Sequence, residues 1–300
     1  MIQECENPIA PGDFKWIFAC NGSARLNCYE RGIESPIQAR LPTGGFSLRN
    51  EEKLLIFWNR LYNEAIQKKK SGRSERACSG KKIKEDIFLE TKLWPAFYEQ
   101  EDAVEKTLTR LDTDYIDLLL IHQPAGNYVA GYRLMEKAYK EGKVKAIGLS
   151  NFNPDQIQEI LKICEIKPAV LQTEVHPYSQ EKELKKLLDK EGMVIQAWYP
   201  LGHGDKALIQ EPLFAKLGEK YGKSSAQIIL RWHIQNGNIV IPGSKNPDHI
   251  KDNFALFDFA LTDEEMAQIA AMDQKKRYYT STPEMLKRYA EMVPPVDEQK

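Results

Sequence analysis

Two side chains suited to proton chemistry stand at the ends of predicted strands. Lys92 lies in the stretch IFLETKL at 87–93, and His122 lies near the end of YIDLLLIHQP at 115–124, where a proline closes the strand. Loops that follow buried strands carry the chemistry of α/β enzymes, so both residues are candidates for an active site. The structural alternative is an extended lysine at a strand end and a hydrogen-bonded core histidine.

Polar side chains also end the next four predicted strands, VKAIGLSNF (144–152), AVLQTEVHP (169–177), MVIQAWYPLG (193–202) and NIVIPGS (238–244). They are Ser150 with Asn151, Gln172 with Glu174 and His176, Trp198 with Tyr199, and Ser244 with Lys245. Each of the six strands leads into a segment with the apolar period of a helix. This alternation predicts parallel strands with right-handed crossovers, arranged as a barrel or as a doubly wound sheet.

Two features favour the barrel. No G-x-G-x-x-G follows any predicted strand, which removes the usual signature of a Rossmann pyrophosphate site. A ring of polar strand ends around one axis is also what a barrel active site needs. We therefore predict an α/β protein with a (β/α)8 TIM barrel as a single domain over 1–300. The first two units fall in residues 1–80, where the pattern is poorly defined, and residues 277–300 form a tail.

Composition excludes several other classes. The 300 residues carry a formal net charge of -1, and no run of Lys and Arg is interleaved with aromatics, so we expect no nucleic-acid partner. The N-terminus lacks a signal-peptide pattern and no apolar run approaches about 20 residues, which predicts a cytoplasmic protein without a membrane partner. The five cysteines form no C-x-x-C pair, so we expect reduced thiols and no metal site.

Six motifs over about residues 81–280 together resemble a known family. They are TKLW at 91–94, DTDYIDLLLIHQP at 112–124, GKVKAIGLSNF at 142–152, QTEVHPY at 172–178, QAWYPLG at 196–202 and IPGSKNPDHIKDN at 241–253. In this order they are similar to the motifs of the aldo-keto reductases, in the short-loop style of the prokaryotic members. The resemblance implies an eight-stranded barrel, usually monomeric, that reduces aldehydes and ketones with a nicotinamide cofactor, most often NADPH.

The resemblance also implies roles for individual residues. The family uses a tyrosine as proton donor, a lysine that lowers the pKa of that tyrosine, an aspartate that pairs with the lysine, and a histidine that orients the carbonyl. Lys92 and His122 match the lysine and the histidine. Tyr62, in LLIFWNRLYNEAIQKK at 54–69, is the nearest match to the tyrosine, and Phe57 then stands at the aspartate position. Turnover without that aspartate is expected to be impaired.

The resemblance also implies which residues contact the cofactor. Side chains that match the family's contacts to the carboxamide and to the nicotinamide ring are Ser150, Asn151, Gln172 and Trp198. Leu201 and Gly202 match the segment over the pyrophosphate, and the adenosine-phosphate segment holds Ser244, Lys245, His249 and Asn253. Gly243 and His249 replace the lysine and arginine of many NADPH-preferring relatives. NADP(H) is therefore the expected cofactor, with NAD(H) as the alternative.

Residues 1–80 leave three outcomes open. They show neither helical nor strand periodicity over most of their length, and a shifted reading frame is one explanation for this. The first outcome is an enzyme that reduces a small carbonyl compound. The second is a catalytically impaired barrel that binds nicotinamide nucleotide as a sensor or partner subunit. The third is a chain that folds poorly, because missing barrel units leave strand edges unpaired.

Overall fold

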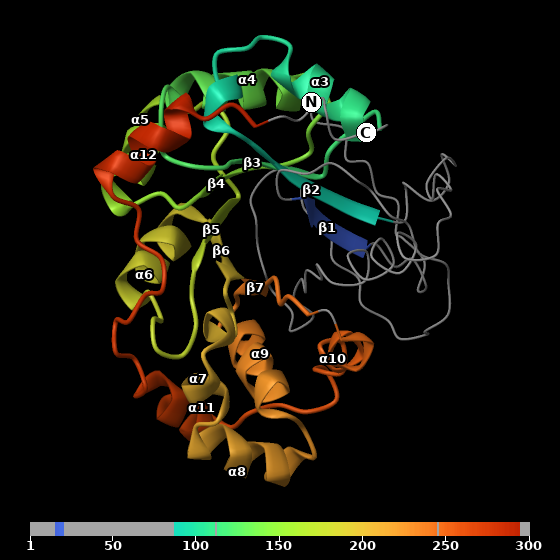
Figure 1. Ribbon diagram of the computed structural model, residues 1–300, viewed down its shortest axis with the longest axis vertical. Helices are drawn as coiled ribbons and strands as arrows, with labels where there is room; N and C mark the ends of the chain where they lie inside the picture. Colours follow the sequence, from blue (N-terminus) through green and yellow to red (C-terminus); the bar gives the residue numbers. More distant parts are fainter. Residues whose placement is uncertain (1–15, 21–86, 112, 245, 295–300) are drawn as a thin grey trace, which may run out of the picture.

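In the described part of the chain, seven strands form one parallel sheet whose order follows the sequence, β1 to β7 (Figure 1). The computed structural model describes residues 16–20, 87–111, 113–244 and 246–294. The strands are β1 (Trp16–Cys20), β2 (Ile87–Leu93), β3 (Leu118–Ile121), β4 (Ile147–Ser150), β5 (Val170–Glu174), β6 (Val194–Trp198) and β7 (Ile239–Val240).

The sheet is strongly curled. In a flat sheet β2 and β6, four strands apart, would be separated by about 19 Å, given about 4.8 Å between neighbours. The amide Nε2 of Gln196 on β6 nevertheless lies 2.7 Å from Oε2 of Glu90 on β2. Side chains of the two strands therefore meet across the inside of the curl, as in a (β/α)8 barrel, and the fold expected from the sequence is confirmed.

Helices follow β2 to β7 along the chain and lie outside this part of the curled sheet in Figure 1. They are α3 (Ala103–Leu111), α4 (Tyr128–Lys140), α5 (Pro154–Ile163), α6 (Lys182–Glu191), α7 (Lys206–Ile209), α8 (Pro212–Tyr221), α9 (Ser225–Gln235), α10 (Pro247–Asp252), α11 (Asp263–Ala270) and α12 (Pro283–Glu291). Short 3-10 turns are η1 (Pro95–Phe97) and η2 (Gly202–Gly204). None of the helices in these ranges has the length and apolar character that a membrane crossing needs.

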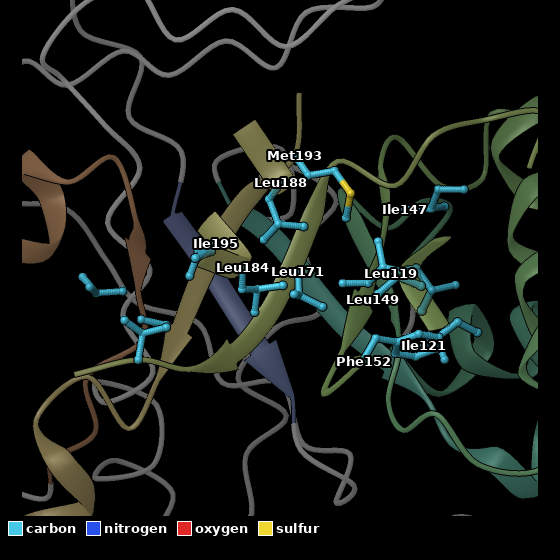
Figure 2. Close-up of a cluster of buried hydrophobic side chains, with 14 of the residues drawn as sticks. Leu119, Ile121, Ile147, Leu149, Phe152, Leu171, Leu184, Leu188, Met193 and Ile195 are labelled. Atoms are coloured by element: carbon cyan, nitrogen blue, oxygen red, sulfur yellow. The ribbon is translucent and has the colours of Figure 1, made fainter. Parts of the chain in front are cut away.

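Successive side chains of each strand face opposite sides of the sheet, which divides the apolar core in two. The outer cluster packs against the helices, and Figure 2 shows Leu119, Leu149, Leu171 and Ile195 beside Leu184 and Leu188 of α6. The inner cluster lies inside the curl and consists of Phe88, Leu118, Leu120, Ala146, Val170, Val194 and Ile239. The alternation fixes which polar residues also face the interior.

Helix caps explain several element starts. The Asn153 side chain accepts from the backbone N–H of Gln156 at the start of α5, and Pro154 takes the first turn, as the sequence predicts. The six strand-to-helix units from Ile87 onward are confirmed, with ends that shift by a few residues. Within the predicted tail, the Thr282 side chain caps α12, a helix that we do not predict from the sequence. Of residues 1–80, where the sequence places the first two units, the described part is β1, and the rest lies outside the described residues.

Candidate active site

The interior of the curl changes from apolar to polar toward the carboxyl ends of the strands. The floor is the inner cluster that begins with Phe88. The next level carries buried Glu90, Gln172 and Gln196, one each from β2, β5 and β6. Two residues further along each strand, or just past its end, come Lys92, His122, Ser150, Glu174 and Trp198. The chain thus places a column of polar side chains, called the shaft below, at the end of the sheet where barrel enzymes hold their substrates.

His122 stands one residue past β3. Its backbone N–H donates to the carbonyl of Leu93 at 3.0 Å, which continues the pairing of β2 with β3. The imidazole meets the Trp94 ring edge-on, with 4.9 Å between the ring centroids. Burial, and then the charge of Lys92, lower the pKa of His122 to about 3. The imidazole is therefore neutral at pH 7 and keeps one N–H to donate.

Tyr98 holds the loop that begins at His122. Its hydroxyl donates to the carbonyl of Gln123 at 2.8 Å and accepts from the backbone N–H of Gln123 at 3.1 Å. Tyr98 is fully buried, and burial raises the pKa of its hydroxyl far above the ordinary value. The hydroxyl therefore stays protonated and fixes the backbone directly after His122.

Lys92 lies on β2 with its side chain on the same face as Glu90. Its positive charge lowers both the pKa of Glu90 and the pKa of His122, so the ammonium group lies near both residues. Burial outweighs this effect at Glu90 and raises the pKa of that carboxyl to about 7. A lysine, a histidine and a buried carboxyl thus share one electrostatic environment.

Asn151, directly after β4, and Trp198, at the end of β6, carry unused hydrogen-bonding atoms. Asn151 has a left-handed backbone (φ 66°), and its Nδ2 donates to Ser150 Oγ at 3.2 Å. Asn151 Oδ1 and Trp198 Nε1 are buried and find no hydrogen-bond partner within the described part of the chain. One unused acceptor and one unused donor suit a ligand with its own amide group, such as the carboxamide of a nicotinamide.

Gln172 is the deeper of the predicted carboxamide contacts. Its Nε2 donates to Glu90 Oε1 at 3.1 Å and also to Gln196 Oε1. The amide of Gln172 is thus oriented by the two other side chains of its own level, Glu90 and Gln196.

Among residues 87–111, 113–244 and 246–294, no group of His, Cys, Asp and Glu side chains is arranged to hold a metal ion.

The loop after β6 is fixed by the C-terminal tail. The backbone of Tyr199, Gly202, His203 and Gly204 is left-handed, which gives the loop its tight course. Beyond it, Asp205 accepts a hydrogen bond from the Tyr278 hydroxyl and an ion pair from Lys276 at 3.2 Å. The hydrogen bond from Tyr278 is the main cause that lowers the pKa of Asp205 to about 2. Leu201 and Gly202, which are predicted to cover a pyrophosphate, lie in this loop between β6 and Asp205.

Glu174 ties the same tail to β5. Its buried carboxylate accepts the backbone N–H groups of Tyr278 and Tyr279, at 2.6 and 2.8 Å, and lies 3.0 Å from His176 Nε2. Burial acts to raise the pKa of Glu174, but the hydrogen bonds from these three residues outweigh it and leave the pKa below its ordinary value. Glu174 is therefore a charged anchor for the tail.

Aromatic side chains line the rim. The ring centroids of Trp198 and Tyr279 are 5.3 Å apart, and the Tyr279 hydroxyl donates to the Tyr289 hydroxyl at 3.4 Å. The ring centroids of Tyr289 and Trp94 are 5.5 Å apart, and Trp94 Nε1 donates to the carbonyl of Met292 at 2.7 Å. Because Trp94 also contacts His122, the rim runs from the histidine to the predicted nicotinamide face.

The predicted adenosine-phosphate segment follows β7. Ser244 Oγ lies 3.4 Å from Nδ1 of the exposed His249, and Asn253 is buried at the end of α10. Lys245 and the predicted proton donor Tyr62 lie outside the described residues. The remaining predicted site residues lie on β2 to β6, directly after these strands, or between β7 and the end of α10.

Sequence reasoning missed three contributors to the site, namely Glu90, Gln196 and Trp94. Glu90 and Gln196 had a usable signal, since each stands two positions before an inward-facing site residue, Lys92 or Trp198. Trp94 belongs to a motif, but its contact with His122 depends on how η1 turns after β2.

A curled parallel sheet with helices outside it and polar side chains gathered at its carboxyl end is the architecture of a barrel enzyme. The sequence model described as "Aldo/keto reductase family" matches residues 59–274. The chain belongs to the aldo-keto reductase family. The match begins upstream of Lys81 and includes Tyr62.

Known proteins agree with this assignment. The "Uncharacterized oxidoreductase YtbE" of Bacillus subtilis (strain 168) is 41% identical over 198 residues, which are 65% of this chain and 70% of that protein. The "Glyoxal reductase" of the same organism is 40% identical over 207 residues, 68% of this chain and 74% of the other. The crystal structure of MGS-M4, an aldo-keto reductase from a Medee basin deep-sea metagenome library, has a TM-score of 0.64 and 35% identity, covering 75% of this chain and 83% of that one.

Proposed function

We propose that this oxidoreductase reduces small aldehydes and ketones to alcohols with a nicotinamide cofactor. The observation that carries the proposal is that Lys92 lies near a buried, neutral His122, at the same end of the sheet as the unused hydrogen-bonding atoms of Asn151 and Trp198. The bound cofactor would supply the hydride. The residues of the chain then have to bind it, orient the carbonyl and deliver a proton.

His122 orients the carbonyl. As a neutral imidazole it donates its N–H to the carbonyl oxygen without competing for the proton that the alkoxide needs. Trp94, packed edge-on against the ring, limits the angles that the imidazole can adopt. The hydrogen bond becomes stronger as negative charge develops on the oxygen, which lowers the barrier to reduction.

Tyr62 is the proposed proton donor. An ordinary tyrosine, with a pKa of about 10, is a weak acid at pH 7, and a nearby ammonium makes it stronger. Lys92 is the proposed source of that charge. Its effect on the pKa of both His122 and Glu90 supports a position at the base of the reaction site.

The proposed cofactor contacts divide along the site. Ser150, Asn151 and Gln172 bind the carboxamide, and Trp198 provides the flat surface for the ring. Leu201 and Gly202 cover the pyrophosphate, while Ser244, Lys245, His249 and Asn253 meet the adenosine phosphates. We propose NADP(H) as the preferred cofactor and NAD(H) as a weaker one, because His249 lacks the bidentate grip of an arginine.

The proposed substrate is a small carbonyl compound, and the protein is proposed to act as a monomeric, single-domain enzyme. A relative named glyoxal reductase supports a small dicarbonyl as the first substrate to test. The rim of Trp94, Tyr279 and Tyr289 favours compounds that present an apolar or aromatic group beside the carbonyl.

Two measurements test the proposal. The purified protein is titrated with NADPH while tryptophan fluorescence is followed, and then glyoxal or benzaldehyde is added while cofactor absorbance is followed. Quenching followed by cofactor oxidation supports the enzyme, and Tyr62→Phe should abolish turnover while it preserves quenching. Quenching without turnover of any carbonyl would contradict the enzyme and favour a nucleotide sensor, and no quenching would contradict both.

A further inference from the structure

Glu90 is a buried carboxyl that the proposed reaction leaves without a role. It lies on β2, two residues before Lys92 and on the same inward face, and its exposed fraction is 0%. A carboxyl at such a site is costly to bury unless its hydrogen-bonding capacity and its charge are both compensated.

Hydrogen bonds compensate both oxygens of Glu90. Oε1 accepts from Gln172 Nε2 at 3.1 Å, and Oε2 accepts from Gln196 Nε2 at 2.7 Å. Gln172 also donates to Gln196, so the three side chains form a closed ring across β2, β5 and β6. Because both amides present donors, the ring matches an ionised carboxylate, which only accepts.

Among the described residues, Lys92 is the source of positive charge that acts on the Glu90 carboxyl. The inward side chains of β3 are the apolar Leu118 and Leu120, and β4 presents Gly148 at the level of Leu120. The neutral amides of β5 and β6 complete the surroundings. Lys92 is the charged group that acts on Glu90 in this part of the chain, and the same ammonium acts on His122.

We propose that Glu90 is a positioning residue for Lys92, whose carboxylate holds the ammonium group charged and directed along the shaft. The role rests on the proposed function, in which Lys92 acidifies the donor tyrosine. It adds to whatever the residues before Ile87 contribute to Lys92. Burial outweighs the effect of Lys92 and raises the pKa of Glu90 to about 7, so loss of either group will change the protonation of the other.

A direct test reads the titration of Lys92 without turnover. Lysines are methylated with 13C-formaldehyde and their pH titrations are followed by NMR, and the Lys92 signal is assigned by its loss in Lys92→Arg. In the wild-type protein this signal should show an inflection near pH 7 as Glu90 ionises. Glu90→Met should abolish the inflection and lower the pKa of Lys92 by about one unit or more, whereas Glu90→Asp should retain both features.

Kinetics supply the second readout. With an active wild-type enzyme, Glu90→Met should lower kcat at least about tenfold with a smaller change in the KM for NADPH, and Glu90→Asp should restore part of the loss. A Lys92 titration that is the same in the wild-type protein and in Glu90→Met would overturn the proposal, and so would a loss of kcat that is equal in Glu90→Met and Glu90→Asp. An inactive wild-type enzyme would contradict the proposed function alone, because the coupling of Lys92 to Glu90 is measured independently.

Discussion

The carboxylate of Glu174 accepts the backbone N–H of Tyr279 at 2.8 Å, across 105 residues of sequence. The same carboxylate accepts the N–H of Tyr278, whose hydroxyl donates to Asp205 in the loop after β6. One buried charge at the end of β5 therefore holds the tail, and the tail holds the loop that is proposed to cover the cofactor. A change at Glu174 should therefore loosen both the tail at Tyr278 and the loop after β6.

Glu174→Gln tests this link. The amide offers one acceptor and turns its NH2 toward an N–H of the tail, so we expect the free energy of unfolding to fall by about 1–3 kcal/mol. Hydrogen exchange should accelerate at the amides of Tyr278 and Tyr279. Glu183→Gln, on the exposed face of α6, is the control. Equal exchange in both variants would show that the tail does not depend on Glu174.

Acid should destabilise the protein through His122. The pKa of His122 in the folded chain, about 3, lies below the ordinary 6.5, so the unfolded chain binds more protons between these values. Stability from this residue is therefore present above pH 6.5 and is lost as pH falls toward 3. In His122→Asn the loss between about pH 7.5 and about pH 4.5 should shrink by about 2 kcal/mol. Urea unfolding at both pH values measures it, and parallel losses would contradict the prediction.

Tyr98→Phe should impair catalysis more than stability alone explains. The variant loses both hydrogen bonds to Gln123, which frees the backbone after His122, and kcat should fall about three- to tenfold. Tyr132→Phe is the matched control, because the buried Tyr132 donates to the carbonyl of Ile166 at 2.7 Å, away from His122. Both variants should lose about 1–2 kcal/mol of stability. Equal kcat values in the two variants would remove Tyr98 from the positioning of His122.

Gly148→Ala should lower the free energy of unfolding although it adds a single methyl group. A Cβ at this position would lie 2.6 Å from the carbonyl oxygen of Val170 and 2.7 Å from Leu120 Cδ2. Since the first of these atoms is strand backbone, the sheet must move, and we expect a cost of about 1–3 kcal/mol. Thermal unfolding measures it against Gly192→Ser, where no atom lies within 4 Å but φ is +73°. A smaller cost for Gly148→Ala than for the strained Gly192→Ser would contradict the crowding.

His249→Arg should sharpen cofactor preference. Arginine can grip a 2′-phosphate with two donors, whereas the exposed imidazole beside Ser244 offers one. The KM for NADPH should fall about tenfold, or about 1.4 kcal/mol, with little change for NADH. His249→Gln serves as the uncharged control. Equal shifts for both cofactors would place His249 away from the phosphate.

The sequence by itself determined the repeating units. Strand alternation and helix period are local properties, so the six units after Ile87, the cap at Asn153 and the inward position of Lys92 followed from residues close in the chain. His122 at the end of a buried strand was predictable for the same reason.

Only the tertiary structure decided what those residues meet. Glu90 and Gln196 are 106 residues apart, and they touch because the sheet curls until β2 faces β6. Glu174 likewise meets Tyr278 because the tail returns across the end of β5. The first contact depends on the curl of the sheet and the second on the course of the tail, and no local pattern specifies either. The surroundings of Glu90 beside Lys92, and the position of the loop that is proposed to cover the cofactor, are therefore set by the tertiary structure.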